Sequence, residues 1–276
     1  MRNSAITSKQ GNKKVDSYSI EWHELETWMK APRVQKMKDS TGKDSTWHGS
    51  ASLEQSLILM RDGWQDGVDM INHGLTHELK DSGVIRSEVW ETAPVGAFAI
   101  IPLYCAGVNE HMLLPNDDQE EPIVNLIVDI ACASMVSSNQ MKNRGVAIAS
   151  LINHIEQSGK RVRLQARWAT TQENFGYNFL INVKEAHEHM DMSRVAFAII
   201  NPSFSRRVCF KLLETVAHRH MGNYGSVLRI DPKSLGDDTF HISEIDHTNK
   251  SALRTAQSAH DHIHSEWKKE LDKHNS

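Results

Sequence analysis

The stretch Val124-Asn-Leu-Ile-Val-Asp129-Ile-Ala-Cys132 decides the fold class of this chain. It is an apolar run that contains one acid, and a helical pattern over residues 142–158 follows it and stops at Gly159. A second strand pattern, Arg161-Val-Arg-Leu-Gln-Ala166, comes next. In many α/β proteins a ligand site begins at the carboxyl end of a buried strand. The stretch therefore predicts a strand-helix-strand unit with a candidate site at Asp129.

Strand and helix patterns continue to alternate along the chain. Strands are expected over residues 161–170, 179–183, 226–230 and 239–245. Helices are expected from Asp191 through Ile200, from Ser205 to about Arg219 with Ser203 as the cap, and over 249–271. This alternation predicts an α/β fold with a mainly parallel sheet and helices on both faces.

Composition divides the chain into five segments. Residues 1–17 are polar without periodicity, and we expect a flexible arm. Residues 18–114 form a mostly helical region, in which Ser52 and Gln55 have the spacing of a capping box. Residues 115–122 are an acidic, proline-bounded connector. Residues 123–248 are the α/β domain, and residues 249–276 are a C-terminal helix.

The bulk composition is that of a globular protein and argues against a membrane protein. Of 276 residues, 39% are hydrophobic and 24% are charged, which excludes a disordered chain. No apolar run approaches the roughly 18 residues that a membrane span needs, and the first ten residues lack the apolar core of a secretory signal. The three cysteines (Cys105, Cys132, Cys209) are widely spaced in apolar surroundings. They predict reduced, buried thiols in the cytoplasm.

Positive charge is concentrated in the centre of the chain. Residues 142–219 contain 12 Lys and Arg against 6 Asp and Glu, a net charge of +6, whereas the whole chain carries −4. Alternate residues of a strand share a face, so the 161–170 strand would present a row of basic side chains. Single-stranded nucleic acid is one partner that such a row would suit. A charged edge strand that blocks aggregation is the alternative. The residues concerned are Lys160, Arg161, Arg163, Arg167 and the aromatic Trp168.

The segment Asn201-Pro-Ser-Phe-Ser-Arg-Arg207 is a candidate anion site. A turn leads into a helix whose first residues include Ser203, Ser205, Arg206 and Arg207. Free backbone N–H groups and two guanidinium groups at a helix N-terminus suit an anion. A capped helix with solvated arginines is the alternative interpretation.

Signals for catalysis are weak. The chain has no Gly-x-Ser-x-Gly elbow, no Walker loop and no Gly-x-Gly-x-x-Gly. His260 and His264 are four residues apart on a predicted helix, which is the spacing of two metal ligands. No His-Glu-x-x-His motif surrounds them, and a solvated helix face is the alternative. No catalytic residues are expected, and a metal-dependent enzyme is the third hypothesis for the function.

The strand ending in Asp129-Ile-Ala-Cys-Ala133, the helix over 142–158 and the 161–170 strand together resemble a von Willebrand factor A-type domain. That family has a Rossmann-like fold used mostly for recognition. Its first strand ends in Asp-x-Ser-x-Ser, whose oxygens suit magnesium. Here Asp129 matches the first ligand, but Ala131 and Ala133 stand where the serines belong.

The resemblance therefore implies a degenerate metal loop. Ser134, Ser137 or Ser138 would replace the missing serines only if the loop were rebuilt, and Thr170 or Thr171 would play the threonine of the second loop. Asp129 bonded to local backbone is the alternative. No cofactor is expected, and Mg²⁺ is the one that the resemblance leaves open.

The overall style of the sequence also resembles uncharacterised proteins encoded by tailed bacteriophages. Three functional hypotheses follow. The first is a non-enzymatic recognition or accessory protein that binds another protein, of the phage or its host, in the bacterial cytoplasm. The second is a single-stranded nucleic-acid-binding factor that supports phage transcription or replication. The third is the metal-dependent enzyme.

Overall fold

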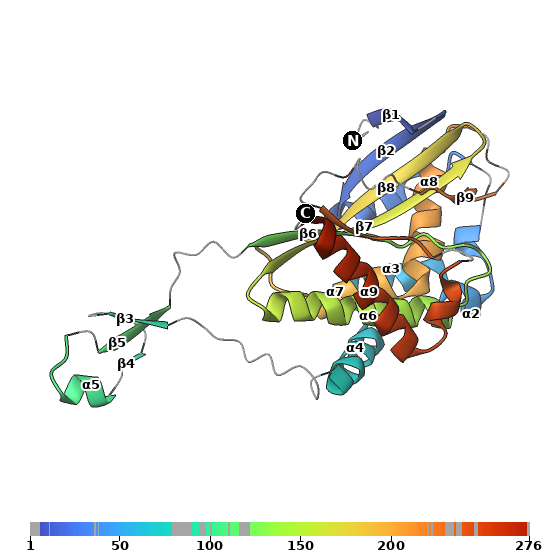
Figure 1. Cartoon of the computed structure of the whole chain (residues 1–276). Coiled ribbons are helices and arrows are strands. Elements are labelled where there is room, and N and C mark those ends of the chain that lie inside the picture. Colours follow the sequence, from blue (N-terminus) through green and yellow to red (C-terminus); the bar gives the residue numbers. More distant parts are fainter. Residues whose placement is uncertain are drawn as a thin grey trace.

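A seven-stranded sheet forms the centre of the molecule (Figure 1). The structure, a computed structural model, describes residues 6–10, 12–35, 37, 39–78, 90–93, 98–99, 101–109, 111–115, 122–219, 221, 223–229, 235, 239–245 and 248–274. The strand order is β1-β2-β8-β7-β6-β10, and β9 pairs with β7. The bounds are β1 (Ile6–Gln10), β2 (Lys13–Glu21), β6 (Ile123–Asp129), β7 (Arg161–Gln172), β8 (Phe175–Lys184), β9 (Ser226–Val227) and β10 (Thr239–Ile242). Most of the predicted acidic connector, residues 116–121, lies outside the described residues.

The sheet is mixed. Strand β6 is parallel to both β7 and β10, and β2 is parallel to β8. Strands β1 and β2 are antiparallel neighbours, and β7 pairs antiparallel with both β8 and β9. The α/β class is thus confirmed, whereas a mainly parallel sheet is not what the described strands form.

Local caps fix where the long helices begin. Asp191 accepts hydrogen bonds from the backbone N–H groups of Ser193 and Arg194, both at 3.1 Å, and so caps α7 as predicted. Ser137 caps α6, which therefore starts four residues earlier than the apolar pattern indicated. The helices are α1 (Leu25–Lys30), α2 (Ser45–His48), α3 (Leu53–Asp62), α4 (Gln65–Glu78), α6 (Ser138–Gln157), α7 (Met192–Ile200), α8 (Phe210–Val216) and α9 (Ala256–His274). Shorter turns are η1 (Trp22–Glu24), η2 (Asp39–Thr41), the π-helical η3 (Phe204–Cys209) and η5 (Lys250–Leu253).

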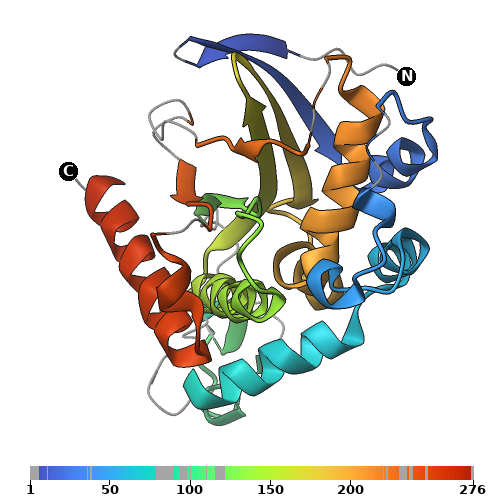
Figure 2. The same ribbon diagram turned by 90° about the vertical axis from the view of Figure 1, so that its right-hand side faces the viewer.

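The helices pack against one apolar face of the sheet. Cross-strand register places Tyr18, Phe179 and Trp168 on this face. Trp28 of α1 contacts Tyr18 at 6.0 Å between ring centroids, and Phe210 of α8 contacts Trp168 at 5.9 Å. Figure 1 shows α6, α7 and α9 below the sheet, and α6 contacts both of the others. In Figure 2, α8 stands beside the strands next to α1.

Toward the amino ends of β6 and β7, the opposite face of the sheet is polar and half-buried. Asn125, Arg163 and Gln165 lie on it, and Asn125 and Arg163 are direct cross-strand partners. The helix contacts described above all fall on the other face. Helices on both faces were therefore a wrong expectation for the part of the chain described. We call this surface the open face.

The expected flexible arm is wrong for residues 6–10 and 12–17, because they form β1 and most of β2. Val15, Tyr18 and Ile20 are buried, and β2 pairs with β8 along its length. The helices α3 and α4 of the predicted N-terminal region contact α7, so they pack on the same core. A separate three-stranded sheet has the order β3-β5-β4. Its strands, with a short helix, are β3 (Trp90–Ala93), β4 (Phe98–Ala99), α5 (Ile101–Cys105) and β5 (Met112–Pro115).

Among the described residues, no helix combines the length and the apolar character that crossing a membrane requires.

Candidate functional site

Asp129 is the centre of a buried ion-pair cluster. Arg167 Nη1 donates to both carboxylate oxygens of Asp129 at 2.8 Å, and His241 Nε2 lies 3.0 Å from Asp129 Oδ2. Arg167 also donates from Nε to Asn178 Oδ1 at 2.9 Å and from Nη2 to the Leu228 carbonyl at 3.1 Å. Asp129 is 0% exposed and Arg167 1% exposed. The carboxylate is thus bound to side chains rather than to local backbone.

This arrangement does not fit the magnesium ion that the resemblance left open. Both Asp129 oxygens are occupied by internal donors, and the methyl groups of Ala131 and Ala133 offer no ligand. The rings of His260 and His264 are in contact, with 4.0 Å between centroids and an interplanar angle of 35°. Yet no group of three or more His, Cys, Asp or Glu side chains suited to a metal occurs in the described part of the chain.

The basic row of β7 is only partly exposed. Arg161 and Arg163 are half-buried on the open face, and Lys160 is exposed. Arg167 is buried on the same face, while Trp168 points to the helix side and is 4% exposed. β7 lies between β6 and β8, so the expected edge strand is wrong. Trp168 is also not available to stack on a base.

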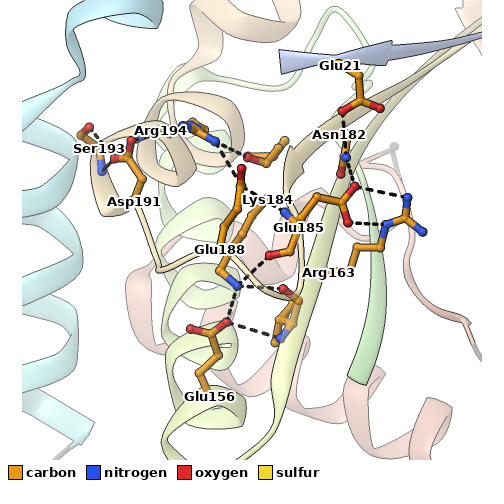
Figure 3. Close-up of polar contacts among 12 residues, drawn as sticks. Glu21, Glu156, Arg163, Asn182, Lys184, Glu185, Glu188, Asp191, Ser193 and Arg194 are labelled. Carbon is orange, nitrogen blue, oxygen red and sulfur yellow. Dashed lines mark hydrogen bonds and ion pairs between the residues drawn. The ribbon is translucent and has the colours of Figure 1, made fainter. Parts of the chain in front are cut away.

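A polar network binds the far end of this row (Figure 3). Arg163 Nε lies 3.3 Å from Glu185 Oε2, and Asn182 donates to the same carboxylate. Lys184 is buried; its Nζ lies 2.8 Å from Glu156 Oε1 and donates to the Val162 carbonyl at 3.0 Å. These contacts join the end of β8 to α6 and neutralise the cations locally.

Burial also explains why the central net charge does not translate into a basic surface. Six of the 12 Lys and Arg residues between 142 and 219 are buried. They donate to carbonyls, hydroxyls or carboxylates within the protein, as the ammonium of Lys211 does to the Ala31 carbonyl at 2.7 Å. The six are Arg144, Arg167, Lys184, Arg206, Arg207 and Lys211.

A pocket of about 230 Å³ opens at the carboxyl ends of β6 and β7. We call it the carboxyl-edge pocket. Its lining includes residues that the sequence indicated as parts of separate candidate sites. The loop after β6 supplies Ser134, β7 supplies Trp168 and Thr170, and the π-helical η3 supplies Ser205 and Arg206. π-Helical turns are often found at functional sites.

Arg206 lies in the wall of the pocket. Its Nη1 donates to the Trp47 carbonyl at 2.7 Å, and its Nη2 donates to the Val136 carbonyl at 2.5 Å. The guanidinium group stacks over the Trp47 ring at 4.1 Å and approaches Cys132 Sγ at 3.5 Å. Arg206 is 1% exposed, so the predicted solvated arginine is wrong here.

The structure separates the remaining residues of the predicted anion site from one another. Arg207 is fully buried and points away from the pocket, donating to Ser50 Oγ at 2.8 Å and the Ser40 carbonyl at 3.0 Å. Ser203 does not cap a helix, and its buried hydroxyl has no hydrogen-bond partner among the described residues. Consecutive helical residues point in different directions, so Arg206 and Arg207 cannot both serve one ligand.

Aromatic residues that the sequence patterns did not single out complete the pocket. Phe210 and Tyr224 stack at 3.8 Å between ring centroids. The Tyr224 hydroxyl donates to Glu214 Oε1 at 2.5 Å and accepts from the Asp39 N–H at 2.9 Å. Burial, followed by the Glu214 carboxylate, raises the pKa of Tyr224 well above 10. No local pattern marks these residues, because their contacts with Trp47 and Asp39 join parts of the chain that lie far apart in the sequence.

Cys132 is a thiol with little nucleophilic character. Burial raises its pKa above the usual value of 9.0, and the nearby positive charge of Arg206 offsets only part of this effect. A protonated thiol is a poor nucleophile. The prediction of buried thiols is confirmed for Cys209, whereas Cys105 is exposed. The pocket thus has the groups for binding a ligand and lacks an activated nucleophile among its described lining residues.

Fold and site together define an α/β protein with a small binding pocket at the carboxyl edge of its parallel strands. Residues 8–272 match the model of a domain of unknown function (DUF7192), and the chain belongs to this family. No curated protein and no solved structure matches the chain.

Proposed function

We propose that this chain is a non-enzymatic recognition protein that binds another protein, with one partner side chain entering the carboxyl-edge pocket. The observation that carries the proposal is the state of the ionisable groups there. Asp129, which does not line the pocket, is already bound by Arg167 and lies 3.0 Å from His241 Nε2, and the Cys132 thiol in the lining keeps its proton. Such a site offers hydrogen bonds and aromatic surface rather than proton transfer. Its volume of about 230 Å³ is below the roughly 300–1,000 Å³ of drug-sized pockets, so it suits a single side chain.

The von Willebrand A-like fold is part of this proposal. The order β8-β7-β6-β10 matches positions 3-2-1-4 of the doubly wound order 3-2-1-4-5-6. It differs from that fold in the antiparallel direction of β8 and in having the described helices on one face. Ligands of such folds bind outside the carboxyl ends of the strands, where this pocket lies. The proposal also includes a bacteriophage source, a phage or host partner and a location in the bacterial cytoplasm. These three points rest only on the resemblance of the sequence to bacteriophage proteins.

Filling the pocket is expected to weaken partner binding. Ser134→Trp places an indole at the mouth, where the serine side chain is exposed, so the fold is retained. Tagged wild-type protein is used to recover a partner from infected cells, and the purified partner is then titrated against each variant. We expect at least about tenfold weaker binding, the loss of about 1.4 kcal/mol from one excluded anchor side chain.

Gln157→Trp is the matched control, since it adds the same exposed indole at the other end of α6. It is expected to bind the partner as the wild type does. Equal affinity of Ser134→Trp and the wild type would show that the partner does not use this pocket, and the proposed function would then be abandoned.

Single-stranded nucleic acid is the second candidate partner. The observation in its favour is that Lys160, Arg161 and Arg163 lie at one end of the open face. Because half of the central cations are buried, we expect weak, salt-sensitive binding of a fluorescent oligonucleotide. Replacing Lys160 and Arg161 by glutamate should remove it. No binding of the wild type at low salt would rule this candidate out.

A further inference from the structure

We propose that the group which the carboxyl-edge pocket binds is an anion carried on a flat apolar ring, with Arg206 as the cation that receives it. This inference rests on the proposed function and adds the chemistry of the ligand. Three independent features of the pocket carry it: an arginine without a counter-charge, hydroxyl groups without partners, and aromatic walls.

The charge of Arg206 is not balanced by an acid in the described part of the chain. Its hydrogen bonds go to the carbonyls of Trp47 and Val136 and to the Cys132 thiol, none of which carries a negative charge. They all leave from Nη1 and Nη2, and no described residue accepts from Nε. A buried cation without a counter-ion is costly, and a bound anion would remove that cost.

Arg206 contrasts with the other buried arginine that borders this region. Arg167 has the Asp129 carboxylate at 2.8 Å, so its charge is satisfied internally. Among the described residues that line the pocket, the one acid is Asp39, which is exposed and forms no ion pair with Arg206. Water screens an exposed carboxylate, so its repulsion of a bound anion is weak.

Two hydroxyl groups remain available to an anion. Ser205 lines the pocket beside Arg206, and no described residue hydrogen-bonds its side chain. The same holds for the side chain of Ser134 at the mouth, whose backbone carbonyl accepts from Trp47 Nε1 at 3.1 Å. Thr170 differs, because its hydroxyl already donates to the carbonyls of Tyr224 and Ser226.

The aromatic walls select a flat group. Phe210 and Tyr224 are stacked with an interplanar angle of 20°, and Trp47 and Trp168 line the same pocket. Aromatic pairs favour offset-stacked or edge-to-face contacts, both of which a planar ring entering between these residues can make. About 230 Å³ leaves room for one ring that carries one anionic group.

Benzoate is the probe for this chemistry, and benzamide and acetate are its controls. Benzamide keeps the ring without the charge, and acetate keeps the charge without the ring. Titration of the full chain, followed by ligand-observed NMR, should give a benzoate Kd on the order of 1 mM, as expected for a small fragment. Both controls should bind at least about tenfold more weakly. Benzamide or acetate binding as tightly as benzoate, or no benzoate binding, would overturn the inference.

Variants connect the probe to the named residues. Ser205→Ala removes a hydroxyl with no described internal partner, so folding should be unaffected and benzoate should bind about tenfold more weakly. Arg206→Gln should abolish benzoate binding; because this arginine also holds two carbonyls, its fold is checked by circular dichroism. Arg163→Gln on the open face is the control and should bind as the wild type does. Wild-type affinity of Ser205→Ala would contradict the assigned contact.

A competition experiment between benzoate and the recovered partner shows whether the anion is part of the partner or a free small molecule. Its outcomes also distinguish failure of this inference from failure of the proposed function. Displacement of the recovered partner by benzoate places the anionic ring on the partner. Benzoate binding that does not displace the partner assigns the pocket to a free aromatic acid. If, in addition, the Ser134→Trp variant binds the partner as tightly as the wild type does, the proposed function is contradicted. Loss of the partner in Ser134→Trp without any benzoate binding keeps the proposed function and overturns this inference.

Discussion

Replacing Arg167 by methionine is expected to lower the free energy of unfolding by about 3–5 kcal/mol. The variant leaves Asp129 as a buried carboxylate that has lost the donor to both of its oxygens. The carbonyl of Leu228 and the amide oxygen of Asn178 lose donors as well. Denaturant unfolding, followed by tryptophan fluorescence, measures the change.

Arg163→Met is the matched control for this prediction. Arg163 lies on the same strand and the same face, but its ion pair with Glu185 is between side chains that are 43% and 32% exposed. Partly exposed pairs contribute about 0–1 kcal/mol, so the control should be nearly neutral. The double variant Asp129→Leu with Arg167→Met removes both charges and should recover most of the loss. Similar losses for Arg167→Met and Arg163→Met would contradict the assignment of Asp129–Arg167 as a buried pair.

Glu214→Ala is expected to have the second large effect, a loss of about 3 kcal/mol. The fully buried carboxylate accepts from Arg33 Nε at 2.5 Å, from Ser40 Oγ at 2.8 Å and from the Tyr224 hydroxyl at 2.5 Å. It therefore ties the segment that carries Arg33 and Ser40 to the pocket wall. Hydrogen exchange should show faster exchange in that segment, and benzoate binding should weaken with it. Glu188→Ala, which removes a carboxylate that is 41% exposed, is the control and should be nearly neutral.

Burial of Tyr224, together with the same carboxylate, makes stability depend on alkaline pH. Because burial and Glu214 raise the pKa of Tyr224, the folded chain keeps a proton that the unfolded chain releases above about pH 10. The stabilisation is complete below that pH and is lost as the pH rises further. In Glu214→Ala the pKa of Tyr224 should fall toward its ordinary value, which ultraviolet titration measures. An unchanged tyrosine titration would show that burial alone sets this pKa.

Elements with local signals were predictable from the sequence. The apolar run before Asp129 and the helical pattern after it gave β6, α6 and β7, and the aspartate at 191 capped α7. The hairpin β1–β2 was not predictable, because its partner is remote: Glu21 contacts Asn182, 161 residues away. The open face was missed for a similar reason. Alternating arginines on β7 suggested an edge strand, whereas they lie on an interior strand with one face free of helices.

The site was predictable by residue type and not by geometry. Ser205 and Arg206 do line one pocket, and their role in binding an anion stays a prediction. The pattern could not show that Arg207 turns to Ser50 or that η3 is π-helical. Asp129 was expected to be a metal ligand because it ends its strand at the position where von Willebrand A-type domains carry their first metal ligand. Only the fold shows that Arg167, its direct partner on β7, already binds it.

The pairing of β2 with β8 also sets an order for folding during synthesis. At roughly 5–20 residues per second, ribosomes need on the order of 10–30 s to make the residues that separate these strands. During that time the apolar side chains of Val15, Tyr18 and Ile20 have no sheet to pack on. The edge of β2 that β8 later covers can associate with other chains, even when its other edge pairs with β1. One edge of β2 therefore stays open to such association until β8 has been made.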